Sequence, residues 1–335
     1  MSPEAFSVCC YIIGAISVFL NGLTVYLIIS QSTSDIRGYR VYLLNFTITD
    51  LIFSILLSFL LQPIPVIPGG GALIAGLTKY TGNGYAGHCV FSLIALVFAH
   101  SIVSLNYCFI YRFASLMDVR AKQMLEKRWY KSLLIGSGEM ICFGIAMLIY
   151  DMRVEDEVFR NNTIVRFPYQ EHLFDGAVWY GYDYKESPHA NIFLVTALTL
   201  APLSCGYNFL CAFIIVAKLH YHRRRLTQRT YNLHLKLMLA LLIQTTAPLV
   251  LFITPISYVF ASAFFLVKGA LTNETIRYLP VLALALHPII NPLVTIFFIA
   301  PYRNAILGRI PSKRRAPVPR SLSQSHSTCN LYYNP

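Results

Sequence analysis

Charged residues are scarce in this chain of 335 residues, since Asp, Glu, Lys and Arg make up only 13% of it, against roughly a quarter in soluble domains. Hydrophobic residues make up 56%. Five stretches contain no charged residue at all: 5–34, 80–111, 187–217, 237–267 and 278–302. Each is longer than the ~20 residues with which an α-helix crosses a bilayer. The composition therefore predicts a membrane protein rather than a water-soluble one.

Two further apolar stretches carry one acid each, residues 41–78 with Asp50 and residues 132–150 with Glu139. None of the seven segments shows the strict alternation of a membrane β-barrel, and lipid offers the backbone no hydrogen-bond partners, so helices are expected. The predicted fold class is an all-α membrane protein, a bundle of seven transmembrane helices. We expect the helices near residues 6–30, 41–62, 89–111, 132–150, 191–217, 235–260 and 278–300, in one membrane domain over residues 1–310. The basic, serine-rich tail at 311–335 is expected to be disordered.

The charges predict the orientation of the chain. The N-terminus and the links after the second, fourth and sixth helices hold ten of the 15 acids but only seven of the 27 bases. The other links and the tail hold the remaining 20 bases and three acids. Because short basic loops mark the cytoplasmic side, we expect the N-terminus outside and the C-terminus in the cytoplasm. The net charge of +12 then reflects this asymmetry and contact with membrane lipids, so no nucleic-acid partner is expected.

Glycosylation sequons agree with this orientation. Those at Asn161 and Asn273 fall in links assigned to the outside, while a third, at Asn45, lies within a helix and is expected to stay unused. No cysteine lies in the long link 151–190. An outer disulfide would therefore have to join Cys89 to Cys9 or Cys10.

Polar residues interrupt the apolar helices. Asn21, Asp50 and Asn291 lie at comparable depths in the first, second and seventh helices. Because an ionised carboxylate in hydrocarbon costs ~2.5 kcal/mol or more, we expect these side chains to face the bundle interior. Two interpretations stay open: hydrogen-bonded contact between helices, or a site for a small cation or water cluster. Glu139 has no evident partner in the sequence.

Prolines inside the fifth, sixth and seventh helices remove backbone donors and crowd the carbonyl one turn earlier. We select Pro255 and Pro292 as hinge candidates, with Asn291 placed to take up a freed carbonyl. The alternative is that these prolines are simply tolerated, as they are in many membrane helices.

Basic residues gather at the predicted inner helix ends. Arg112 is the first charge after 32 uncharged residues and ends the third helix, and Arg223, Arg224 and Arg225 follow the fifth. The ordinary interpretation is an anchor that places its charge at anionic lipid. The other is a surface that binds the peptide of a partner protein.

Several of these motifs resemble those of rhodopsin-type receptors: Asn21-Gly22, the spacing LNxxxxD that ends at Asp50, the aromatic-Arg-aromatic sequence around Arg112, and NPxxT from Asn291. The closer resemblance is to nematode serpentine chemoreceptors of the Str superfamily, most like class delta. It is carried by YLLNFTITDLI (42–52), QPIPVIPGG (62–70), YCFIYRF (107–113) and INPLVTIFFIAPYR (290–303), and its most specific element is the final Pro-Tyr-Arg.

The resemblance implies a chemoreceptor that signals through a heterotrimeric G protein, from the plasma membrane and typically from the cilia of sensory neurons. It also implies that the chain after the final Pro-Tyr-Arg turns onto the inner membrane surface, where Tyr302–Ile310 is expected to form a short helix. Ser321, Ser323, Ser325 and Ser327 in the tail are expected kinase targets, because phosphates there would offset the basic run, and arrestin is a further partner expected at the tail. The chain departs from rhodopsin-type receptors at Tyr111, where an acid usually precedes the Arg, and at Thr295, where a Tyr is usual. Arg112 therefore lacks its usual acidic partner, and Tyr111 or loop contacts are expected to replace it.

A receptor of this kind binds a small-molecule cue among the outer halves of its helices. By depth and chemistry we select Phe98, His100, Phe193, Tyr258 and His287 as ligand-binding residues, and we expect no cofactor and no enzymatic activity. One alternative is an intramembrane metal hydrolase, which needs about three His ligands, yet the chain has no H-x-x-x-H pair. The other is a channel or transporter, which usually shows repeats and midplane charges.

Overall fold

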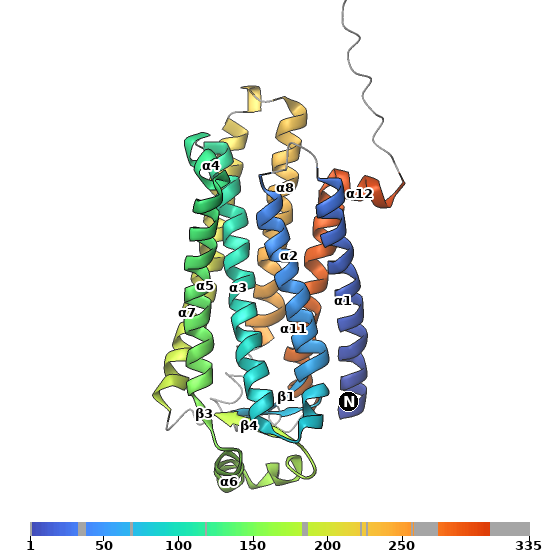
Figure 1. The fold of residues 1–335 in the computed structure, drawn as a ribbon, viewed down its shortest axis with the longest axis vertical. Helices are drawn as coiled ribbons and strands as arrows, with labels where there is room; N and C mark the ends of the chain where they lie inside the picture. Colours follow the sequence, from blue (N-terminus) through green and yellow to red (C-terminus); the bar gives the residue numbers. More distant parts are fainter. Residues whose placement is uncertain are drawn as a thin grey trace, which may run out of the picture.

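The structure is a computed structural model that describes residues 2–32, 38–67, 70–117, 119–182, 187–221, 223–225, 227–255, 257 and 274–308. Seven helices in these residues are long and apolar enough to cross a membrane, and they lie side by side (Figure 1). They are α1 (Pro3–Gln31), α2 (Arg40–Ile55) with its π-helical continuation η2 (Leu56–Leu61), α3 (Gly84–Met117), α5 (Arg128–Asp151), α7 (Pro188–Tyr221), α8 (Gln228–Pro248) with the π-helical η6 (Leu249–Ile253), and α11 (Glu274–Phe298). The prediction of seven transmembrane helices is confirmed.

The links form two different ends of the bundle. At the end that holds the N-terminus, here the strand end, lie β1 (Pro63–Val66), β2 (Gly71–Ile74), η3 (Leu77–Thr81), β3 (Arg153–Val154), α6 (Asp156–Arg166), η4 (Pro168–Leu173) and β4 (Trp179–Tyr182). At the opposite end, here the α12 end, lie α4 (Val119–Glu126), η5 (Arg223–Arg225) and α12 (Ala300–Ile306) (Figure 1).

A small antiparallel sheet of order β1-β2-β4-β3 closes the strand end. It joins the link after α2 to the link after α5, with Leu73 opposite Trp179. Tyr180 and Tyr182 of β4 are buried, and both rings pack against Phe91 of α3. Cys9, Cys10 and Cys89 are free thiols. Strand pairing and aromatic packing, rather than a disulfide, therefore hold this sheet on the bundle.

At the other end, α12 differs from the predicted surface helix. It begins at Ala300, two residues earlier than expected, and its Tyr302 is fully buried. The Tyr302 hydroxyl lies 3.0 Å from the Ser32 hydroxyl, which follows α1. Ile306 and Leu307 are exposed, as a helix lying on lipid requires, whereas Ile310 falls outside the described residues. Tyr302 thus fixes α12 to the end of α1.

The α3–α5 contact depends on a residue without a side chain. Gly138 is buried on α5, and a Cβ there would collide with the Tyr107 hydroxyl and lie 2.7 Å from Val103 Cγ1. The same hydroxyl donates a hydrogen bond of 2.8 Å to the Leu134 carbonyl. Gly136, half a turn away, has no atom within 4 Å of its own Cβ position. The two glycines therefore form a matched pair, one in a close contact and one in open space.

We predict that Gly138→Ala lowers the free energy of unfolding by about 1–3 kcal/mol, because overpacking forces α3 and α5 apart. Gly136→Ala should leave stability unchanged or raise it by up to about 1 kcal/mol, because Ala favours the helix. The measurement is the thermal unfolding midpoint of the purified full chain. Adding Tyr107→Phe to Gly138→Ala should restore part of the loss, and equal effects of the two Gly substitutions would contradict this account.

Candidate functional site

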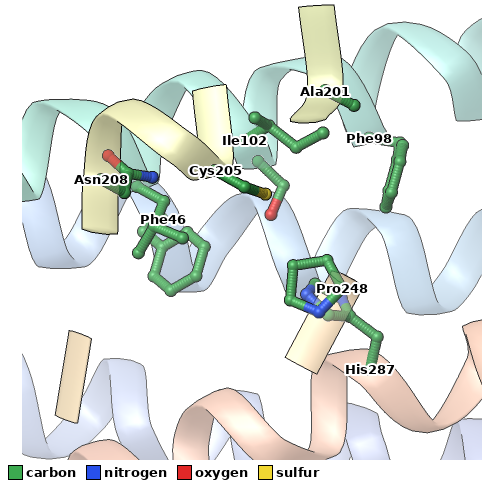
Figure 2. Close-up of a pocket in the computed structure, with 10 residues that line it drawn as sticks. Phe46, Phe98, Ile102, Ala201, Cys205, Asn208, Pro248 and His287 are labelled. Atoms are coloured by element: carbon green, nitrogen blue, oxygen red, sulfur yellow. The ribbon is translucent and has the colours of Figure 1, made fainter. Parts of the chain in front are cut away.

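A small cavity lies between α2, α3, α7, α8 and α11. Its lining consists of Phe46, Phe98, Ser101, Ile102, Leu105, Ala201, Cys205, Asn208, Pro248 and His287. Figure 2 shows that these side chains come from helices on opposite sides of one space. The cavity holds about 20 Å³, which is room for about one water molecule. The helices are therefore nearly in contact around it.

The lining is apolar except at three side chains. Ser101 donates a hydrogen bond to Asp50, as described below, but His287 Nδ1 and Asn208 Oδ1 are buried and have no hydrogen-bond partner among the described residues. None of the described residues that line the cavity is charged. Phe98 and His287, two of the selected ligand residues, meet here with ring centroids 6.3 Å apart. The cavity therefore offers an apolar space with two unused polar atoms.

The Asp50 carboxylate lies directly behind this cavity. It is fully buried, and its Oδ2 accepts a hydrogen bond of 2.6 Å from Asn291 Nδ2. Its Oδ1 accepts one of 2.8 Å from the Ser101 hydroxyl. We call Asp50, Ser101, Asn291 and Asn21 the Asp50 cluster. It joins α1, α2, α3 and α11, and Ser101 belongs to both the cluster and the cavity wall.

Asn21 completes the cluster by contacting a carbonyl that a proline has left free. Pro292 has no N–H, so the carbonyl of Pro288, one turn earlier, has no donor within the helix. Asn21 Nδ2 donates to that carbonyl at 2.8 Å. We expected Asn291 to take up a freed carbonyl, but Asn291 is committed to Asp50, and Asn21 performs this task from α1.

The cluster extends toward α8 through Gln244. Its Nε2 donates to the Asn291 carbonyl at 3.2 Å and to the Thr295 hydroxyl at 3.1 Å. Thr295, which stands in place of the usual Tyr, is thus a contact between α11 and α8. The other hinge candidate, Pro255, follows η6 on the continuation of α8. The two hinge candidates therefore lie on helices that Gln244 connects.

His100 lies apart from the cavity and supplies the partner that Glu139 was missing. Its Nδ1 is 2.9 Å from Glu139 Oε1 on α5, and the Glu139 side chain is 44% exposed. Its Nε2 lies 3.0 Å from both Asn45 Nδ2 and the Ser104 hydroxyl. His100 thus joins α2, α3 and α5 rather than lining the cavity. Asn45, the sequon expected to be unused, is engaged inside the bundle.

Phe193, another of the selected ligand residues, is not among the residues that line the cavity. Phe193 packs against the hydrophobic cluster at the strand end, which contains Phe6, Phe53 and Tyr278. Tyr258 lies outside the described residues. Among the described residues, no three His, Cys, Asp or Glu side chains come close enough together to hold a metal ion.

At the α12 end, Arg112 is buried, with 5% of its surface exposed. Its guanidinium carbon lies 3.8 Å from the centroid of the Tyr39 ring, while its Nε and Nη2 have no hydrogen-bond partner. Burial raises the pKa of Tyr39 well above its ordinary value, so the ring under Arg112 is a neutral phenol. Arg112 is therefore held by a cation–π contact where an acid is usual.

Tyr111 does not contact Arg112 through its hydroxyl, which donates a hydrogen bond of 2.9 Å to Glu126 Oε1 of α4. A Cβ at Gly38 would collide with this pair, so a small residue is required where the first link passes. Tyr42 adds a hydrogen bond of 2.8 Å to the Leu125 carbonyl. The links after α1 and α3 are thereby held against α3 at the α12 end of the bundle.

The arginines that follow α7 are exposed. Arg223 and Arg224 lie in the short turn η5, and the guanidinium of Arg223 lies 5.4 Å from the ring centroid of Tyr231. The Arg225 side chain lies outside the described part of the chain. At the strand end, Asn161 is exposed on α6, while Asn273 is not described. The basic turn and Asn161 therefore lie at opposite ends of the bundle.

Comparison with known proteins identifies similar sequences. A family model described as "Serpentine type 7TM GPCR chemoreceptor Sri" matches residues 1–306. The chain is 28% identical to serpentine receptor class delta-2 of Caenorhabditis elegans, over 91% of this chain and 83% of that protein. It is 26% identical to class delta-1 of the same organism, over 90% and 80%.

A solved structure shows the same fold. Squid rhodopsin aligns with a TM-score of 0.66 at 15% identity, over 92% of this chain and 86% of rhodopsin. Identity this low supports the fold alone.

We predict that Asp50 and Asn291 are energetically coupled. In a double-mutant cycle, Asp50→Ala and Asn291→Ala should show an interaction free energy of about 0.5–3 kcal/mol, because each single change leaves a buried polar partner unpaired. The measurement is the unfolding midpoint of the single and double variants. As the control, Asp50→Ala should combine additively with Tyr107→Phe, whose hydroxyl contacts α5 and shares no partner with Asp50. Additivity in the Asp50–Asn291 pair would exclude the coupling.

Proposed function

The chain belongs to the family of serpentine seven-transmembrane chemoreceptors described by the Sri model, and we propose that it is a G-protein-coupled chemosensory receptor. It binds an external small-molecule cue in the cavity and activates a heterotrimeric G protein at the α12 end. The observation that carries this proposal is the shared side chain of Ser101, which lines the cavity and also donates to Asp50. A ligand in the cavity thus touches the hydrogen bonds that join α2, α3 and α11.

Ligand binding requires the cavity to widen. Small-molecule sites usually enclose about 300–1,000 Å³, whereas this cavity holds about 20 Å³. A cue therefore binds a conformer with separated helices more tightly than the one described, and it shifts the population toward that conformer. Separation of α3 from α11 strains the path from Ser101 through Asp50 to Asn291.

The hinge residues turn that strain into movement at the α12 end. Pro292 follows Asn291 directly, and Pro248 and Pro255 enclose η6, whose π-helical turns are a weak point in α8. We propose that the inner parts of α8 and α11 move outward at these prolines. Gln244, which connects the two helices, makes the movements concerted.

Arg112 is the residue that the movement makes available. It is buried over Tyr39 with two nitrogen atoms unpaired, so a carbonyl or carboxylate of a G-protein peptide can pair with it once the link containing Tyr39 moves. Arg223, Arg224 and Arg225 belong to the same basic face and also contact anionic lipid. The tail at 311–335 is the proposed target of a kinase or arrestin.

The Asp50 cluster has a second candidate role. Asn21 Oδ1 and Asn291 Oδ1 are buried acceptors without donors, which are the atoms that a small cation or water would use. The hydrogen bonds already present support helix contact as the principal role, because they satisfy both carboxylate oxygens.

The proposed orientation places the strand end outside and the α12 end in the cytoplasm, in the plasma membrane and, for a sensory receptor, in a ciliary membrane. We predict that Asn161 carries a glycan in a eukaryotic host, because it is exposed at the strand end. Asn161→Gln should increase gel mobility, and glycosidase should remove the difference, with Asn45→Gln as the control without effect. Access of a cytosolic probe to residue 161 would refute the orientation.

We predict that cue-evoked signalling depends on Ser101 and Arg112. Cells that express the chain with a promiscuous G protein are screened against volatile and water-soluble cues. Ser101→Ala should shift the potency of an active cue by roughly 5–150-fold, the usual range of coupling between sites, and Arg112→Ala should abolish the response at equal surface expression.

The matched control is Ser204→Ala, which removes a hydroxyl that joins α7 to Asn106 of α3 but does not line the cavity. Its response should stay within a few-fold of the unmodified chain. If a cue-evoked response is unchanged by both Ser101→Ala and Arg112→Ala, the proposed route from cavity to G protein is wrong.

A further inference from the structure

The first turn of α11 contains a buried arginine, Arg277, that has no ion-pair partner among the described residues, which do not include the side chain of Glu274 in the same turn. Arg277 exposes only 8% of its surface, and its Nε has no hydrogen-bond partner. Among the described residues, the ion pairs are His100–Glu139, Lys122–Glu126 and Arg153–Asp156. None of them involves Arg277.

The other cations described at the strand end are less buried, although Nε of Arg153 and Nε of Arg160 also lack a hydrogen-bond partner among the described residues. Lys79 and Arg166 are exposed, and Arg153 donates a hydrogen bond of 3.0 Å to Asp156 Oδ1. An Arg at a helix end normally extends its charged head into water or toward headgroups. Arg277 is instead buried along most of its side chain, and its Nε has no hydrogen-bond partner among the described residues.

The surroundings of Arg277 favour an anion. The next residue, Tyr278, is buried and packs against Phe6 of α1 with ring centroids 4.8 Å apart, and β1 also packs against α11. Apolar neighbours weaken dielectric screening and strengthen any charge pair formed beside them. The first turn of a helix also carries the positive end of the macrodipole. An unpaired buried charge is costly, and an incoming anion would remove that cost.

We propose that Arg277 forms an anion-binding site at the strand end of α11, which takes a carboxylate, phosphate or sulfate group. The planar guanidinium can pair with such groups through two parallel hydrogen bonds. The site is separate from the cavity, since Arg277 lies ten residues before His287, or about 15 Å along an α-helix. The anion comes either from a soluble acidic cue or from a lipid headgroup.

The test uses the purified full chain in nanodiscs of phosphatidylcholine and measures the unfolding midpoint. Butyrate should raise the midpoint, because a ligand that binds the folded state stabilises it, and butanol at the same concentration should not. Chloride keeps the ionic strength equal in all samples. In a second arm, phosphatidylglycerol is added to the nanodiscs without butyrate, which distinguishes a lipid headgroup from a soluble anion.

Arg277→Gln should lose the anion-dependent rise, with affinity lowered roughly tenfold or more, and Arg277→Lys should keep part of it. In chloride alone, without butyrate or phosphatidylglycerol, Arg277→Gln should melt no earlier than the unmodified chain, because it removes a cost. Arg166→Gln, an exposed cation at the same end, should respond like the unmodified chain. The proposal is overturned if neither butyrate nor phosphatidylglycerol gives a rise that depends on Arg277, or if Arg277→Gln is destabilised in chloride alone. No step of this test needs a G protein, so its outcome is independent of signalling.

Discussion

The burial of the Asp50 carboxylate is the constraint on which the arrangement of the helices depends. A carboxylate surrounded by hydrocarbon must receive hydrogen bonds from the protein itself, and its two oxygens draw Asn291 from α11 and Ser101 from α3. Those donors fix the depth and rotation of both helices relative to α2. Asn21 then fixes α1 by taking the Pro288 carbonyl. Four helices are positioned by a few atoms at one depth.

The same arrangement places a missing backbone hydrogen bond next to the Asp50 cluster. Pro292 frees the Pro288 carbonyl that Asn21 binds, so the position where α11 lacks its own backbone hydrogen bond is also a contact with α1. The cavity has Ser101 in its wall, next to the same cluster. A buried polar group that loses its hydrogen bond in an apolar interior pays a large free-energy cost. A small displacement of Ser101 at the cavity therefore favours a switch from one set of hydrogen bonds to another over a gradual lengthening of the existing ones.

The seven helices could be predicted because the bilayer demands long uncharged segments, and a buried acid had to have donors at its own depth. The helix ends were less predictable, since α3 extends from Gly84 to Met117 although hydropathy indicated only residues 89–111. The side chains that contact the predicted site residues were hardest to predict. Asn208, Gln244 and Asn45 are polar residues within helices, so the criterion that selected Asn21 would also have found them. Tyr39 has no such signal, because its role depends on where the first link passes.

The two buried arginines, Arg112 and Arg277, differ in how the cost of burying their charge is offset. Arg112 lies over a neutral aromatic ring that offsets part of its cost. Arg277 has no ion-pair partner among the described residues, so no such contact is recorded to offset the cost of its burial. Because α11 carries Arg277 in its first turn and Asn291 and Pro292 further along, the charge at the strand end and the hydrogen bonds of the Asp50 cluster belong to a single helix.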